Sequence, residues 1–240
     1  MKANYDHMKT LLIFALLLFS TGAFAQISNL DFNGVPARLT PYEGVDGSPY
    51  LFPDWGKASV ATTNGGVKKD VTYRFDIHSN ELEVVNEAGN NIILDKNYLE
   101  YVILMRPPNH IAQSPSPGLL PSLLFKKGFE FIPGVDSDDL INVLAEGERY
   151  TLVRKFYSNL ITPPKNSYSP TAGKMFVFEE TYFLINANQE VSTVKSKTNA
   201  ILKAIDPTDL EAAKQIIKDG KLDLNREDHL VSFFEELNKS

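Results

Sequence analysis

Apolar and polar positions alternate along much of the chain between residues 57 and 195, and this period of two predicts a series of β-strands. The clearest runs are VTYRFDI, residues 71–77, and ELEVV, residues 81–85. Clusters of Gly, Asn and Pro separate the runs, and these residues favour tight turns. The pattern therefore predicts an antiparallel β-meander whose neighbouring strands are joined by hairpins.

The apolar period becomes helical after Ser196. Thr208-Asp209-Leu210-Glu211 fits a capping box, and Gly220 is the expected end of the helix that follows. Asn225 is the expected cap of a last helix. The apolar stripe of that helix has the i, i+3, i+4, i+7 spacing of a core-facing surface and consists of Leu230, Phe233, Phe234 and Leu237.

These patterns together predict an α+β fold that is mainly β. We expect an antiparallel meander sheet, curved or rolled into a half-barrel, covered by two or three C-terminal helices. Residues 26–240 are expected to form a single β-rich domain, with the helical segment at 196–240. The stretch RPPNHIAQSPSPGLLPS, residues 106–122, contains five prolines and is expected to be a loop.

Residues 1–25 have the pattern of a signal peptide. Met8-Lys9-Thr10 is a short basic region, LLIFALLLF is an apolar run, and Ala23-Phe24-Ala25 is a small-x-small cleavage site. The apolar run is shorter than the roughly 20 residues that a membrane-spanning helix needs. Met8 is an alternative start, because export requires nothing from the residues before it. We expect an exported protein, periplasmic or extracellular, with no transmembrane segment after cleavage near Ala25.

Composition narrows the functional classes. The chain has no cysteine, which excludes disulfides, a lipid-modified cysteine and a thiol nucleophile. Its formal net charge of −6 at pH 7 argues against nucleic acid as a partner, because phosphate binding requires a basic surface.

The segment YRFDIHSNELEVV brings Asp76, His78 and Glu81 within six positions. One interpretation is a metal or acid/base site, although a zinc site wants at least three protein ligands. The other is a hairpin in which strand alternation places these polar residues together on a solvated face.

The hairpin interpretation predicts a two-residue turn at Ser79-Asn80. It pairs Ile77 with Leu82 across the turn, and in the same register it pairs Phe75 with Val84. Ile77 and Leu82 are then expected to be buried. His78, on the opposite face, is expected to be exposed.

Motifs for catalysis are missing from the sequence: it has no G-x-S-x-G elbow, P-loop or G-x-G-x-x-G fingerprint. We therefore expect no catalytic residue, no cofactor and no metal site. A hydrolase with an unrecognised motif is the remaining enzymatic alternative. It would require convergence in one cleft of two or three members of a polar set, namely Asp54, Asp76, His78, Glu81 and His110.

The segment SPYLFPDWG gathers Tyr50, Phe52 and the only tryptophan, Trp55, around a proline turn. These rings either plug one end of the sheet or line a ligand site. In the second case His110, from the proline-rich loop, would complete the site. The expected partner is an apolar small molecule or an envelope protein.

The signal peptide, the segment GSPYLFPDWGK, the hairpin-rich middle and the helical C-terminus resemble a family of small uncharacterised exported bacterial proteins. The resemblance implies an envelope or secreted location and no particular activity. A looser likeness of architecture is to periplasmic lipoprotein carriers with half-barrel folds. We therefore expect a non-enzymatic binding or interaction module, with an apolar-ligand or lipid carrier as the alternative.

Overall fold

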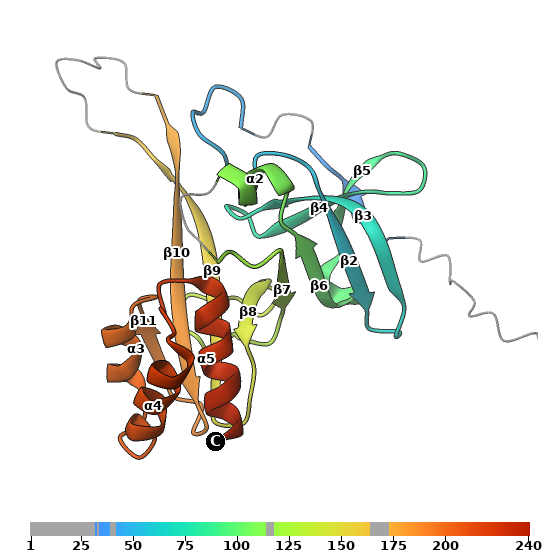
Figure 1. Ribbon diagram of the computed structural model, residues 1–240. Helices are drawn as coiled ribbons and strands as arrows, with labels where there is room; N and C mark the ends of the chain where they lie inside the picture. Colours follow the sequence, from blue (N-terminus) through green and yellow to red (C-terminus); the bar gives the residue numbers. More distant parts are fainter. Residues whose placement is uncertain (1–31, 33, 39–41, 114–117, 164–172) are drawn as a thin grey trace, which may run out of the picture. The chain divides into compact units, whose positions relative to one another are not determined.

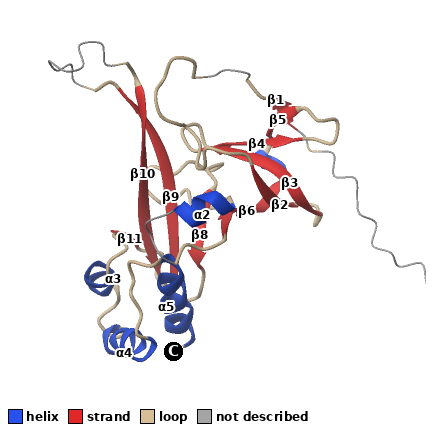
Figure 2. Cartoon of the chain, turned by 45° about the horizontal axis from the view of Figure 1, so that its top comes forward, coloured by secondary structure: helices blue, strands red, loops and turns tan. Residues whose placement is uncertain are grey.

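Eleven strands of the described residues form one antiparallel sheet (Figures 1 and 2). The computed structural model describes residues 32, 34–38, 42–113, 118–163 and 173–240. The signal peptide expected at residues 1–25 lies outside them. The order along the sheet is β1-β5-β4-β3-β2-β6-β7-β8-β9-β10-β11. The strands are β1 (Gly34–Pro36), β2 (Gly56–Thr62), β3 (Val67–Asp76), β4 (Glu81–Val85), β5 (Asn91–Leu94), β6 (Leu99–Met105), β7 (Ser122–Lys126), β8 (Ile141–Ala145), β9 (Tyr150–Ile161), β10 (Met175–Asn186) and β11 (Val191–Val194).

Three helices follow the last strand and lie beside the β8–β11 end of the sheet (Figure 1). They are α3 (Thr198–Ala204), α4 (Leu210–Gly220) and α5 (Glu227–Lys239). Helix α5 contacts β8 and β9, and α3 contacts β11. The predicted α+β, mainly β architecture with C-terminal helices is therefore confirmed. In the part of the chain that the structure describes, no helix has both the length and the apolar character that a membrane crossing requires.

The sheet is strongly curved. The rings of Phe75 in β3 and Phe125 in β7 meet at 5.2 Å between centroids, although β2 and β6 lie between those two strands. In a flat sheet, three strand spacings of about 4.8 Å would hold the backbones about 14 Å apart. Direct contact therefore requires the sheet to curl around its concave side chains.

Three groups of buried side chains hold this sheet. One fills the concave side of β2–β7 and includes Phe75 and Phe125. A second lies between β8–β11 and the helices, and it includes the whole predicted stripe of α5, every member of which is 0% exposed. The third lies on the opposite face of β8–β10, under the connection from residue 129 to residue 135.

The hairpin at residues 73–85 forms, but in another register. Phe75 pairs with Leu82 and Tyr73 with Val84, so the predicted pairings of Ile77 with Leu82 and of Phe75 with Val84 are wrong. The turn is four residues long, because the Asp76 carboxylate accepts hydrogen bonds from the backbone N–H groups of His78 and Ser79, at 2.8 and 3.0 Å. The shift is by two positions, so it preserves the faces.

The predicted burial of this hairpin is confirmed at three positions: Ile77 and Leu82 are buried, and His78 is exposed. The polar face is not solvated throughout: Asp76 and Glu83 are only 3% and 5% exposed, so the prediction is wrong for Asp76, although His78 is exposed and Glu81 half-buried.

The segment before β2 covers this face of the hairpin. Backbone hydrogen bonds join Leu51 N–H to the Phe75 carbonyl and Ile77 N–H to the Pro49 carbonyl, at 2.9 and 2.8 Å. The Tyr50 hydroxyl then donates to Glu83 at 3.1 Å. The carboxylates of Asp76 and Glu83 therefore have hydrogen-bond partners inside the protein instead of water.

Three expectations about the helices and loops are wrong. The capping box of α4 does not form, because the Thr208 hydroxyl instead donates to Asp206 at 2.7 Å, and the residue at the cap position is Asp209, whose side chain makes no capping hydrogen bond. The cap of α5 is Arg226 in place of Asn225. The end of α4 is as expected, because its last residue is Gly220 and the left-handed residue Lys221 (φ 48°) follows it. The expected loop at 106–122 also contains a short helix, α2 (Pro108–Gln113), which begins at a proline, a residue favoured at the first helical position.

Truncating the buried stripe of α5 should destabilise the fold. Phe233→Ala should lower the free energy of unfolding by about 3–5 kcal/mol, because it leaves a cavity in a fully buried position. Urea unfolding measures the change. Glu235→Ala, at an exposed position of the same helix, is the control and should have little effect. Equal losses in the two variants would contradict the packing of α5 against the sheet.

Candidate functional site

Strands β9 and β10 form the floor of an open cavity of about 440 Å³. Because side chains alternate along a strand, cross-strand partners share a face. Arg154 pairs with Tyr182, and the next pair on the same face joins Phe156 to Glu180. Of these two neighbouring pairs on the floor, one consists of a guanidinium and a phenol, and the other of an aromatic ring and a carboxylate. The full lining is Leu51, Phe52, Arg106, His110, Leu119, Arg154, Phe156, Phe178, Glu180, Tyr182, Ser196, Asn225 and Glu227.

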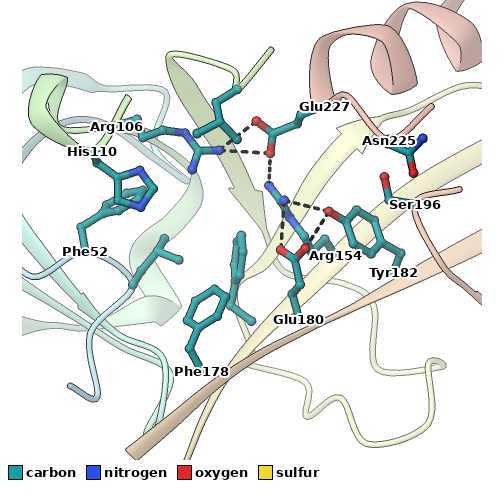
Figure 3. A pocket seen from close by; sticks show the side chains of 13 residues that line it. Phe52, Arg106, His110, Arg154, Phe178, Glu180, Tyr182, Ser196, Asn225 and Glu227 are labelled. Carbon is teal, nitrogen blue, oxygen red and sulfur yellow. Dashed lines mark hydrogen bonds and ion pairs between the residues drawn. The ribbon is translucent and has the colours of Figure 1, made fainter. Parts of the chain in front are cut away.

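A buried chain of ion pairs forms the polar side of the cavity (Figure 3). Glu227, the first residue of α5, accepts hydrogen bonds from Arg106 Nη2 on both carboxylate oxygens, at 3.0 and 2.8 Å. Arg154 Nη2 donates to the same carboxylate at 2.5 Å. All three residues are 4–7% exposed. One carboxylate therefore joins the end of β6, the middle of β9 and the start of α5.

The other N–H groups of Arg154 donate hydrogen bonds to its neighbours in the sheet. Its Nε and Nη2 donate to Asn142 of β8 at 3.1 and 2.9 Å, and its Nη1 donates to Tyr182 and Glu180 at 3.1 and 3.2 Å. Burial works against the charge of Arg154, but the Tyr182 hydroxyl and the carboxylates of Glu227 and Glu180 outweigh it and raise the Arg154 pKa. The guanidinium is thus fixed in place as a cation.

Aromatic rings form the other side of the cavity. Phe178 is 52% exposed and lies 5.9 Å from Phe156 between ring centroids. Phe52 packs edge-on against His110 at 4.9 Å. Burial and the nearby charge of Arg106 lower the pKa of His110, so the imidazole is neutral at pH 7. The cavity therefore has one apolar wall and one wall of fixed polar groups.

The structure separates the four residues expected to bind a ligand. Phe52 and His110 line the cavity. Tyr50 and Trp55 do not line it, and they lie against the guanidinium of Arg74 at 3.8 and 4.7 Å from their ring centroids. This placement follows from the turn in SPYLFPDWG, which sends neighbouring rings to different sides of the segment.

The polar set that a hydrolase would need does not meet in this cavity. Of its members only His110 contributes to the lining. Asp54 accepts a hydrogen bond from Asn109 at 2.9 Å, and His78 Nδ1 lies 2.7 Å from the Ser158 carbonyl oxygen. A search of the described residues finds no group of three or more His, Cys, Asp and Glu side chains that could hold a metal ion.

The central polar residues of the cavity were not expected from the sequence. Arg154 did carry a signal, because it lies between Leu152 and Phe156 at the alternating positions that face the core. A charge in an apolar register indicates a buried polar contact. Glu227 and Arg106 carried no such signal, since 121 positions separate them.

Comparisons of the chain with protein-family models, with curated proteins and with solved structures gave no match. The functional interpretation therefore depends on the residues of the cavity.

Removing the charge of the shared carboxylate should destabilise the folded protein. Glu227→Gln should lower the free energy of unfolding by about 3–5 kcal/mol, because two buried guanidinium groups lose their common counter-charge. Urea unfolding measures the loss. Glu236→Gln removes a carboxylate from an exposed ion pair of the same helix and should change stability little. A loss no larger than that of the control would contradict the role assigned to Glu227.

Alkaline pH should destabilise the protein through its phenols. Burial, the largest cause in each case, raises the pKa values of Tyr50, Tyr150 and Tyr182 to about 12. Between pH 10 and 12 the unfolded chain loses these protons while the folded chain keeps them, so the free energy of unfolding falls as pH rises. Urea unfolding at pH 8–11 should show the fall, and Tyr182→Phe should make it shallower. A flat profile above pH 10 would contradict these shifts.

Proposed function

We propose that this protein is an exported, non-enzymatic binding module that holds a small amphipathic molecule in the cavity above β9 and β10. The observation that carries the proposal is the two-sided lining. Phe178 presents an open aromatic surface, while Arg106 and Arg154 supply a wall of fixed polar groups to the same cavity. Small-molecule sites are concave, partly apolar and supplied with a few fixed polar groups.

The polar wall favours a preformed binding site. Arg154 is 4% exposed and makes hydrogen bonds through all three of its nitrogens. Side chains held in this way lose little rotamer freedom when a ligand binds, which lowers the entropic cost of association. The cavity volume of about 440 Å³ lies within the range of small-molecule sites, roughly 300–1,000 Å³.

An acyl-chain carrier fits the described residues less well. The concave side of β2–β7 is filled by side chains that are less than 10% exposed, among them Phe75 and Phe125. The cavity above β9 and β10 has charged groups along one wall, and a hydrocarbon chain would displace water from the exposed Glu180 carboxylate without replacing its hydrogen bonds. We therefore favour a ligand with polar groups of its own.

The apolar wall supplies the test of this function. We expect at least one of three probes, cellobiose, lauric acid or phenylalanyl-glycine, to raise the thermal unfolding midpoint of the protein. A ligand at 100 times its Kd stabilises the native state by about 2.7 kcal/mol. The rise should disappear in Phe178→Ala, which removes the aromatic surface of the cavity.

The matched control is Phe131→Ala. Phe131 is 46% exposed and does not line the cavity, so this variant should respond to the probe like the wild type. If no probe raises the midpoint, or if the rise survives in Phe178→Ala, the proposed function is wrong.

A further inference from the structure

The formal charges along the cavity cancel. Arg106 and Arg154 are balanced by Glu180 and Glu227, and His110 is neutral at pH 7. A charged ligand would lose hydration on entering and would meet no net opposite charge. The cavity therefore favours an uncharged molecule.

The polar wall keeps both donors and acceptors for such a molecule. Arg106 uses Nε for the Leu120 carbonyl and Nη2 for Glu227, and its Nη1 has no partner among the described residues. The Glu180 side chain is 37% exposed, and each of its oxygens accepts one hydrogen bond, from Tyr182 or from Arg154. A carboxylate oxygen has room for a second donor. Groups that both donate and accept, such as hydroxyls, suit this wall.

The aromatic side requires an apolar surface on the same ligand. The Phe178 ring is half-exposed at the cavity and is supported by Phe156 behind it. A sugar ring has such a surface, because its axial C–H groups form an apolar face while its hydroxyls point outward from the edge. Neutral apolar molecules lack the hydroxyls.

We propose that the ligand of this cavity is an uncharged carbohydrate, whose ring stacks on Phe178 and whose hydroxyls bond to Glu180 and Arg106. This inference rests on the proposed function and specifies its ligand class. The sugar face covers the exposed aromatic ring, and the hydroxyls replace the water that the open polar groups lose. Neither wall then contains an uncompensated charge.

Isothermal titration calorimetry at pH 7 tests the ligand class. The probes are glucose, galactose, N-acetylglucosamine, cellobiose and maltose, with glucuronic acid, galacturonic acid and glucosamine as charged counterparts. At least one neutral sugar should bind, and its charged counterpart should bind at least tenfold more weakly. Phe178→Ala should weaken binding of the neutral sugar at least tenfold, whereas Phe131→Ala should not.

A charge substitution sharpens the test. Glu180→Gln keeps an acceptor oxygen but gives the cavity a net positive charge, so the affinity for a uronic acid relative to its neutral sugar should rise about tenfold. Glu179→Gln makes the same substitution on the opposite face of β10 and should leave that ratio unchanged. Thermal unfolding of each variant confirms that it is folded.

The outcomes separate the two proposals. Binding of lauric acid or phenylalanyl-glycine that depends on Phe178, with no binding of a neutral sugar, would overturn the carbohydrate inference and leave the proposed function standing. Equal affinity for neutral and charged sugars would also overturn the inference. If none of the probes binds, both proposals fail.

Discussion

The shared carboxylate of Glu227 is the interaction on which the arrangement of the cavity depends. It joins Arg106 at the end of β6 to Arg154 in β9, and it also accepts a hydrogen bond from the backbone N–H of Leu120 at 2.6 Å. The start of α5, the sheet and the connection before β7 are thereby fixed to one point. Burying these charges carries a desolvation cost that offsets much of their attraction, so the arrangement specifies position more than it adds stability. Its place in the first turn of α5 also suits a carboxylate, because the helix dipole is positive there.

One face of β9 and β10 supplies both the core and the cavity. Near the helices, Leu152 and Leu184 pair and are buried beneath α5. Further along the same face, the pairs of Arg154 with Tyr182 and of Phe156 with Glu180 line the open cavity. The alternation of the strands is the same throughout. The residues of this face belong to the core where the helices cover the strands, and they line the cavity where the helices end.

Curvature explains why the two halves of the sheet have different roles. On the β2–β7 side the sheet curls until side chains from β3 and β7 touch, and the concave space is filled. On the β8–β11 side the helices cover the sheet, and Arg106, Phe52 and His110 from the curled half reach its uncovered part. The cavity therefore forms where the filled half meets the helix-covered half. Strands β9 and β10 each supply both aromatic and polar residues to its lining, and the other residues come from distant parts of the chain.

Local patterns determined the strands, most of the turns and the core-facing stripe of α5, because alternation and helical spacing depend only on which side of an element faces the protein. They also determined that Ile77 and Leu82 are buried. They could not determine the register of that hairpin, which the hydrogen bonds of Asp76 set, or the burial of Glu83, which requires Tyr50 from a distant segment. Local patterns could not reveal the cavity, because its polar groups come from β9, β10, α5 and the residue that follows β6. The sequence by itself determined the elements and their buried faces; only the tertiary structure decided which charges meet, because ion pairing depends on distances that no local period encodes.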